Sequence, residues 1–398
     1  MSGDRCTVSI DTLLARGVWR YWDDKLAGSI LPPVYVSAIY SHPVGDKTLR
    51  PRAGDLKYSR ENNPTVMELE EVMACVENGD WSLAFSSGMG ALSTAIIAYS
   101  RPGTRITVSR LVYGSTRGLL EGLSRRMDIR VEVRGPPWED LLESAEASDI
   151  VIVETMGNPT LRIPPLRELY TRCRKHGCRV LVDNTFATPI LYKPLDDGAW
   201  LSAESTTKYI AGHNDVVGGL LAGKGEDLYN KLWDWRRVLG ATMHPFEAYL
   251  TIRGMKTLHL RIERSSKTAM QVAAWLEDDK RVSRVYYPGL ESHPDHREAK
   301  SLFNGVYGGV VSFELVGGEK AAMKFLSSLK IISPAPSLGG VESLASYPYT
   351  ASHRNLPEEE RLDLGITPGL IRLSVGMEDP DDLIEDIDKA LEAATPTL

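Results

Sequence analysis

The chain has 398 residues, of which 42% are hydrophobic and 25% are charged, and this is enough for two domains with buried cores. Its net charge is -7 and Lys and Arg form no long block, which argues against a nucleic-acid partner. No apolar stretch approaches the roughly 20 residues of a membrane span, and the N-terminus has no signal-peptide core. We therefore expect a cytoplasmic protein without a membrane partner.

The four cysteines, Cys6, Cys75, Cys173 and Cys178, are sparse and show no CxxC spacing. In a cytoplasmic protein this pattern favours reduced, mostly buried thiols over a disulfide or a metal site. We therefore expect free thiols.

The first part of the chain, residues 1–57, predicts an extended N-terminal arm, because short apolar pieces alternate with Pro, Gly and charged residues. Residues 58–255 predict a large domain in which short apolar strands are separated by helical stretches. The strands are expected in "SLAFSS", "RITVS", "DIVIVE", "RVLVD" and "GGLLAG". Apolar strands without alternation, each followed by a helix, indicate a parallel sheet covered on both faces.

Residues 256–398 predict a smaller C-terminal α+β domain. A helix in "SKTAMQVAAWLED" is followed by alternating strands in "GVVSFELVG" and "LIRLSVG". A last helix opens at Asp379-Pro380, an N-cap followed by proline in the first turn. Its apolar face is predicted to comprise Leu383, Ile384, Ile387 and Leu391.

Four polar loops follow the predicted strands of the large domain. Ligands of open parallel sheets bind beyond the carboxyl ends of the strands, which is where these loops are expected to meet. The loops are "SSGMGAL" (residues 86–92), "VETMGNPT" (153–160), "VDNTFATP" (182–189) and "ESTTKY" (204–209). The small residues of the first loop leave backbone amides free at a positive helix end, which suits a phosphate.

Lys208, in the last of these loops, is the candidate for covalent chemistry. A lysine amine can form a Schiff base with an aldehyde. If the aldehyde is that of pyridoxal 5'-phosphate, a carboxylate such as Asp183 would keep the ring nitrogen protonated, and an aromatic residue such as Tyr113 would cover the ring face. Candidate phosphate-binding residues are Ser87, Gly88, Met89, Ser205 and Thr207.

Each of these residues alone has an ordinary explanation as a cap, a turn residue, a solvated lysine or a packing aromatic. Their joint occurrence at strand ends favours the cofactor site. Ser205 and Lys208 also fit the SxxK pattern of serine acyl-enzymes, but no SDN or KTG element accompanies them. A dinucleotide site is disfavoured because Ser93 replaces the third glycine and no acidic residue occurs between Trp81 and Leu120.

A metal site is not expected. The stretch His293-Pro294-Asp295-His296 offers candidate ligands, but no third one in the same stretch, so a loop is the simpler interpretation.

Seven segments together resemble the Cys/Met-metabolism family, the pyridoxal-phosphate enzymes of trans-sulfuration. The resemblance extends over nearly the whole chain, roughly from Ile30 to Leu391, and the segments occur in order. The segments are residues 58–65, 86–89, 182–189, 205–219, 252–261, 337–348 and 370–379.

The resemblance implies an aspartate aminotransferase-like α/β fold of type I and a homotetramer built from two active dimers. It implies that Tyr58 and Arg60 reach the cofactor phosphate of the neighbouring subunit. It also implies that Arg372 binds the substrate α-carboxylate, with Ser337 and Asn158 beside that carboxylate or the cofactor ring.

For catalysis, the resemblance implies that Lys208 moves protons at the substrate and that Tyr113 or Tyr58 protonates the leaving group. The implied activity is γ-elimination or γ-replacement on a sulfur amino acid or homoserine ester, of the cystathionine γ-lyase or γ-synthase type. Pro336 stands where those enzymes commonly have a glutamate for the distal amino group of the substrate. A methionine γ-lyase or O-acylhomoserine sulfhydrylase activity is therefore the alternative.

Overall fold

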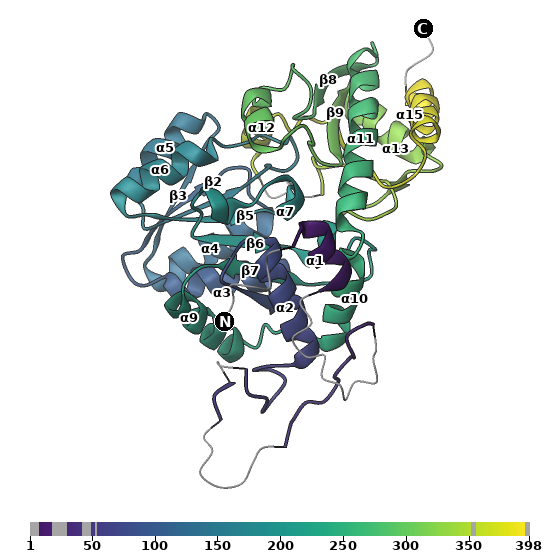
Figure 1. Cartoon of the computed structure of the whole chain (residues 1–398). Coiled ribbons are helices and arrows are strands. Elements are labelled where there is room, and N and C mark those ends of the chain that lie inside the picture. The colour runs from purple at the N-terminus through teal and green to yellow at the C-terminus, as the bar shows by residue number, and fades with distance from the viewer. Residues whose placement is uncertain (1–7, 18–29, 42–48, 52–53, 352–355, 395–398) are drawn as a thin grey trace.

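Two β-sheets form the frame of the protein, with the long helix α11 (Leu258–Glu277) lying beside the smaller one (Figure 1). The computed structural model describes residues 8–17, 30–41, 49–51, 54–351 and 356–394. None of the helices in these ranges combines the length and the apolarity that crossing a membrane requires.

The larger sheet has seven strands in the order β1-β7-β6-β5-β4-β2-β3. Its strands are β1 (Trp81–Phe85), β2 (Arg105–Ser109), β3 (Arg130–Arg134), β4 (Ile150–Glu154), β5 (Arg179–Asp183), β6 (Leu201–Glu204) and β7 (Gly219–Gly223). The sheet is mostly parallel as predicted, but β7 runs antiparallel to both of its neighbours. An apolar strand that is buried on both faces carries no signal of its direction, so the sequence did not predict this reversal.

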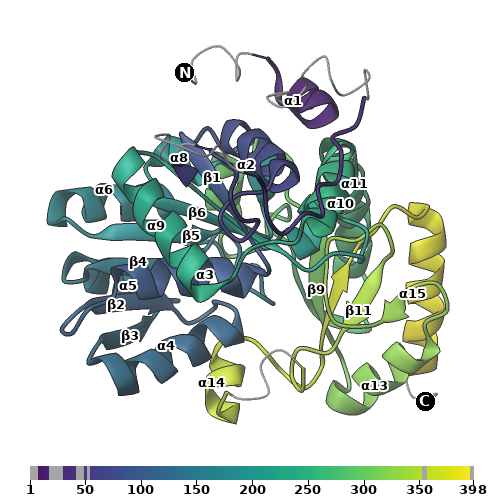
Figure 2. The same cartoon turned by 90° about the horizontal axis from the view of Figure 1, so that it is seen from below.

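Helices cover both faces of this sheet. They are α2 (Pro64–Val76), α3 (Gly88–Tyr99), α4 (Gly114–Met127), α5 (Trp138–Glu146), α6 (Leu166–His176), α7 (Thr188–Leu191), α8 (Pro194–Asp197), α9 (Glu226–Leu239) and α10 (Pro245–Met255). Along β4, Val151 and Val153 join the core that contains α5 and α6, whereas Ile150 and Ile152 join the core that contains α3 and α9 (Figure 2). The alternation explains why β4 is apolar at consecutive positions.

The C-terminal sheet has five strands in the order β10-β11-β12-β9-β8. Its elements are β8 (Val282–Tyr286), α12 (His296–Leu302), β9 (Val310–Leu315), α13 (Gly318–Ser328), β10 (Ser333–Pro334), β11 (Leu344–Ser346), α14 (Glu358–Asp363), β12 (Leu370–Ser374) and α15 (Pro380–Ala394). The last helix buries Leu383, Ile387 and Leu391 as predicted, whereas Ile384 is half-buried. Each buried side chain contributes roughly 1.5–3 kcal/mol to folding.

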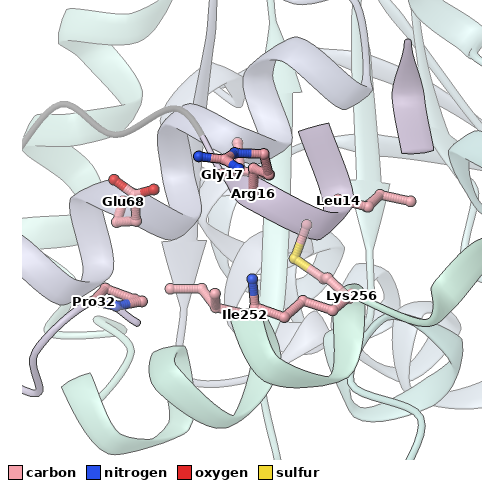
Figure 3. A pocket seen from close by; sticks show the side chains of 9 residues that line it. Leu14, Arg16, Gly17, Pro32, Glu68, Ile252 and Lys256 are labelled. Atoms are coloured by element: carbon pink, nitrogen blue, oxygen red, sulfur yellow. The ribbon is translucent and has the colours of Figure 1, made fainter. Parts of the chain in front are cut away.

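The N-terminal arm is not extended throughout, because residues 10–16 form the helix α1. Leu13 and Leu14 are buried in the main core, and the Lys256 amine donates a hydrogen bond to the Ala15 carbonyl near the end of this helix. Figure 3 shows the hollow between α1, α2 and the end of α10, with Glu68 and Lys256 on its wall. Its volume of about 10 Å³ leaves no room for a ligand.

The expectation of free thiols is wrong for Cys173 and Cys178, which form a disulfide. Gly177 ends α6 in the left-handed conformation (φ 82°) and turns the chain back towards β5, which places the two Cα atoms 4.6 Å apart. This separation lies in the range that a disulfide requires. Cys75 is also disulfide-bonded, and Cys6 lies outside the described residues.

Candidate active site

A cavity of about 520 Å³ lies between the carboxyl ends of β4, β5 and β6 and the C-terminal domain. This volume is typical of a small-molecule site. The cavity brings together most of the residues that the sequence predicted. Those lining it are Ser87, Gly88, Met89, Tyr113, Asn158, Asp183, Ser205, Thr207, Lys208, Ser337 and Arg372.

One end of the cavity is built to receive an anion. Ser87 caps α3, and its Oγ accepts a hydrogen bond of 2.9 Å from the Gly90 amide. The chain approaches closely here, because a Cβ on Gly88 would lie 3.0 Å from the Cβ of Ser205. The positive end of a 12-residue helix therefore faces the hydroxyl-bearing loop that contains Ser205 and Thr207, an arrangement that suits a phosphate.

Asp183 supplies the carboxylate of the cavity. Its Oδ1 accepts hydrogen bonds from the Thr185 amide at 3.1 Å and from the Thr185 hydroxyl at 2.5 Å. Its Oδ2 makes no hydrogen bond to the part of the chain that the structure describes. Burial raises the pKa of Asp183. A protonated ring nitrogen in the cavity would pair with this carboxyl group and offset the cost of burying its charge.

Tyr113 is held at the cavity by its backbone. Its amide donates a 2.6 Å hydrogen bond to Oε1 of Glu154, while the residue as a whole remains 47% exposed. Glu154 is buried at the end of β4, and both burial and the nearby Asp183 raise its pKa. Glu154 therefore ties the start of α4 to the end of β4, where the aromatic ring of Tyr113 is available to cover a ligand.

Lys208 lies at the centre of the cavity on the short turn η3 (Thr206–Ile210). Its amine donates a 2.8 Å hydrogen bond to the hydroxyl of Ser337, which comes from the C-terminal domain. Burial, with the positive charge of Arg372 in addition, lowers the pKa of Lys208 to about 8. An appreciable fraction of the amine is therefore uncharged near neutral pH, as reaction with an aldehyde requires.

Ser337 has a positive φ of 101°, which is strained for a residue with a side chain. In this conformation its hydroxyl reaches Lys208 while its carbonyl accepts a 2.8 Å hydrogen bond from Nη2 of Arg372. Nη1 of Arg372 donates to Oδ1 of Asn158 at 2.7 Å. Arg372 is 6% exposed and its Nε has no partner, and no carboxylate pairs with it among the described residues. A buried cation in this state suits a carboxylate ligand.

Behind the cavity lies a pair of buried acids, Glu77 at the end of α2 and Glu204 at the end of β6, which are 1% and 2% exposed. The side-chain Nδ2 of Asn184 donates to Oε1 of Glu204 at 3.1 Å, and the Thr155 hydroxyl donates to Oδ1 of Asn184 at 2.7 Å. Burial raises the pKa of Glu77 to about 7, and burial with the charge of Glu77 raises the pKa of Glu204 well above its ordinary value. The network supports the strand ends that carry Asp183 and Ser205.

We predict that Glu77→Gln flattens the pH dependence of stability. The pKa of Glu77 is about 7 in the folded protein against 4.5 as its ordinary value, so its favourable contribution is complete below pH 4.5 and is lost as the pH rises through 7. The loss amounts to roughly 3 kcal/mol. Urea denaturation midpoints between pH 5 and pH 8 measure it.

Glu121→Gln, at an exposed position of α4, is the control for this prediction, because its carboxyl group is not buried. A Glu77→Gln protein whose midpoint falls between pH 5 and pH 8 as steeply as that of the wild type and the control would contradict the prediction.

Tyr58 and Arg60 do not line the cavity of their own chain. Tyr58 is 39% exposed, and the guanidinium carbon of Arg60 lies 5.3 Å from the centre of its ring. Nη1 of Arg60 donates to the carbonyl of Arg237 at the end of α9. Their contact with the cofactor phosphate of a neighbouring subunit stays a prediction.

Several further residues line the cavity that were not among the predicted site residues. Glu154 is the last residue of one predicted strand and Thr185 lies just beyond another, so their position at strand ends was the available signal. The others are apolar or small and carry no chemical signature. The full set is Leu92, Glu154, Thr185, Phe186, Leu338, Ser346 and Ala351. Pro336, noted in the sequence as a departure, also lines the cavity.

The loop that contains the candidate metal ligands His293 and Asp295 has a structural contact instead. The described residues contain no group of three His, Cys, Asp or Glu side chains that could hold a metal ion. The loop containing His293 and Asp295 instead contacts the large domain, with Asp295 accepting from Arg162 at 2.6 Å. The cavity itself fits pyridoxal phosphate, because an anion site, a buried carboxyl group and a lysine with a lowered pKa share one space.

The comparisons with known proteins agree with this fit. Residues 19–392 match the family described as Cys/Met metabolism PLP-dependent enzymes. The chain is 38% identical over 375 residues to a cystathionine gamma-lyase of Dictyostelium discoideum, covering 93% of this chain and 94% of the relative. It is also 38% identical over 371 residues to a cystathionine beta-lyase of Lactococcus lactis, covering 93% and 96%.

Among solved structures, a cystathionine gamma synthase from Xanthomonas oryzae pv. oryzae, in complex with aminoacrylate and cysteine, superimposes with a TM-score of 0.91 at 36% identity. The match covers 98% of this chain and 100% of that one. These similarities argue against the alternative of a serine acyl-enzyme, and they support the predicted fold of type I. The chain therefore belongs to the Cys/Met-metabolism family of pyridoxal-phosphate-dependent enzymes.

Proposed function

We propose that this enzyme catalyses γ-elimination or γ-replacement on a sulfur amino acid or homoserine ester, with cystathionine as substrate or product. The observation that carries the proposal is the arrangement of Lys208, Asp183 and Arg372 around one cavity. It provides an amine for the cofactor, a carboxyl group for its ring and a cation for the α-carboxylate of an amino acid. The names of the similar proteins support cystathionine as the compound.

Bound pyridoxal phosphate supplies an aldehyde that takes up the substrate amine and a ring that stores electrons from the α-carbon. Arg372 holds the α-carboxylate, which orients the α-hydrogen towards Lys208. Lys208 removes the proton from the α-carbon and returns it at a neighbouring carbon. Asp183 keeps a proton on the ring nitrogen. Tyr113 of the same chain, or Tyr58 of a neighbouring one, gives a proton to the departing group.

The proposed assembly is a homotetramer of two active dimers in the cytoplasm. Support comes from large apolar side chains exposed on the arm, at the end of α9 and on α10, which a second copy of the chain would cover. They are Val36 at 72%, Ile39 at 69%, Val238 at 66%, Leu239 at 43% and Phe246 at 53% exposure. Figure 1 shows described parts of the arm extending away from the sheet. Such an arm would carry Tyr58 and Arg60 towards another subunit's cofactor.

A second candidate function is favoured by the apolar part of the cavity. Pro336, Leu338 and Ala351 line it on the C-terminal side, and none of them can pair with a distal ammonium group. This lining favours a methyl thioether or an acyl ester over a second amino-acid group. Methionine γ-lyase and O-acylhomoserine sulfhydrylase activities are therefore the alternatives.

The proposed function predicts that the purified enzyme, supplied with pyridoxal phosphate, releases α-ketobutyrate from L-cystathionine. A coupled assay that distinguishes the two possible α-keto acids measures it. Pyruvate in place of α-ketobutyrate would mean β-cleavage. Absence of both acids would contradict cystathionine as the lyase substrate, and release of α-ketobutyrate from L-methionine would then establish the alternative.

A further inference from the structure

The loop after β4, residues 155–163, is bonded to the C-terminal domain at consecutive positions. Arg372 donates to the Asn158 side chain at 2.7 Å, as described above. The hydroxyl of Ser312, on β9, donates to the Pro159 carbonyl at 2.7 Å. Two consecutive residues of the loop therefore contact the C-terminal domain: Asn158 contacts Arg372, and Pro159 contacts β9.

The other end of the loop is held by Asp295, which precedes α12. Its Oδ2 accepts from Nε of Arg162 at 2.6 Å and from the Ile163 amide at 2.9 Å, and its Oδ1 accepts from Nη2 of Arg162 at 3.2 Å. Trp138 donates to Oδ1 from its indole nitrogen at 3.3 Å. The side chain of Asp295 is only 9% exposed and that of Arg162 25%, so these charge-assisted bonds are partly shielded from water.

His293 completes the contact. Its Nδ1 accepts a 3.2 Å hydrogen bond from the Asp295 amide, so the ring proton must lie on Nε2. Nε2 then donates to the Thr160 carbonyl at 3.2 Å. His293 is 2% exposed, and burial lowers its pKa to about 4, which keeps the ring neutral in this tautomer at neutral pH. The neutral ring of His293 thus presents an N–H donor to the Thr160 carbonyl, which can only accept.

We propose that His293 and Asp295 are positioning residues, which lock loop 155–163 to the C-terminal domain so that Asn158 holds Arg372 in place for the substrate carboxylate. Neither residue lines the cavity, so each acts through the loop. The inference rests on the proposed function in one respect, namely that Arg372 binds the α-carboxylate of an amino acid.

The test compares Asp295→Asn with Asp279→Asn in the full-length, cofactor-loaded enzyme. Asp279 is a close match, because it pairs with Arg281 in the same domain with side-chain exposures of 11% and 24%, but the pair does not touch the loop. The probe is L-alanine, which carries only the amine and carboxylate common to the substrate class, and its binding is followed by the absorbance of the cofactor. Asp295→Asn is expected to weaken L-alanine binding about tenfold, and Asp279→Asn by less than roughly twofold.

If Asp295 had a purely structural role, both variants would unfold at a lower temperature and both would bind L-alanine as the wild type does. That result would overturn the inference. A second pair of variants gives an answer even if Asp295→Asn does not fold. His293→Gln retains a donor for the Thr160 carbonyl and is expected to bind L-alanine normally, whereas His293→Leu is expected to bind it several times more weakly. Equal affinities of these two variants would also overturn the inference.

The proposed function is tested by a separate assay of the same proteins. A wild type that binds L-alanine but releases no α-keto acid from L-cystathionine or L-methionine contradicts the proposed reaction. The ratio of L-alanine dissociation constants between the variants still decides the role of His293 and Asp295.

Discussion

Replacing Lys208 with alanine is expected to abolish turnover while leaving the cofactor able to bind. The start of α3 and the hydroxyls of Ser205 and Thr207 would still bind the phosphate. The cofactor is therefore expected to bind, but without a covalent bond to the protein. Turnover loses both the amine that reacts with the aldehyde and the group that moves the α-proton, and we expect a loss of roughly a thousandfold or more. Steady-state release of α-keto acid measures it, and equilibrium dialysis measures the retained cofactor.

The control for this prediction is Lys256→Ala. Lys256 is also partly buried and burial also lowers its pKa, but it lies in the hollow under α1 (Figure 3). Loss of its bond to the Ala15 carbonyl should lower stability without changing turnover. A Lys208→Ala protein whose turnover stays within about tenfold of the wild type would overturn the assignment of Lys208.

The strands of the larger sheet that the sequence missed, β3 and β6, show where apolar patterning fails. β3 ("RVEVR") lies at the sheet edge, where charged residues alternate with valine and the central-strand pattern is absent. β6 ("LSAE") is short and half polar, yet every residue of it is buried. Its polar residues are accommodated by neighbouring side chains, as when Asn184 donates to Glu204. Such tertiary partners have no counterpart in a local pattern.

The cavity residues could be predicted from the sequence more readily than the order and direction of the strands. Asp183 ends β5, whereas Ser87 and Lys208 lie in the loops that follow β1 and β6. The topology of a parallel sheet brings such strand ends together. Glu154 and Glu204 also end strands, but a lone acid there resembles an ordinary turn residue, and only burial reveals its altered pKa. The disulfide was not predictable, since it depends on the reversal of the chain at Gly177.

The two buried arginines near Lys208 differ in what surrounds them. Arg261 donates to backbone carbonyls of Tyr209 at 2.7 Å and Gly254 at 2.9 Å, and its Nε donates to the Thr257 hydroxyl at 3.1 Å. All three nitrogens are therefore satisfied within the protein. Arg372 instead has an Nε without a partner and lines the cavity. Burial lowers the pKa of each to about 10, so both stay charged at neutral pH.

This contrast predicts that Arg372→Ala raises the KM for the amino-acid substrate about a hundredfold, which corresponds to about 2.7 kcal/mol of lost binding. The substrate carboxylate loses a charge-assisted partner, and no other described cation takes its place in the cavity lining apart from Lys208. Arg372→Lys should fall between the two, because it keeps the charge but not the planar pair of donors. Steady-state kinetics with L-cystathionine, or with L-methionine if that proves the substrate, gives these values.

Arg261→Lys separates loss of binding from loss of stability. It removes hydrogen bonds to carbonyls at a buried site outside the cavity, so its thermal midpoint should fall while its KM stays close to that of the wild type. If Arg372→Ala behaved in the same way, with a lower midpoint and an unchanged KM, Arg372 would be a structural residue. The carboxylate would then have to be bound elsewhere, and Asn158 and Ser337 would lose their assigned place beside it.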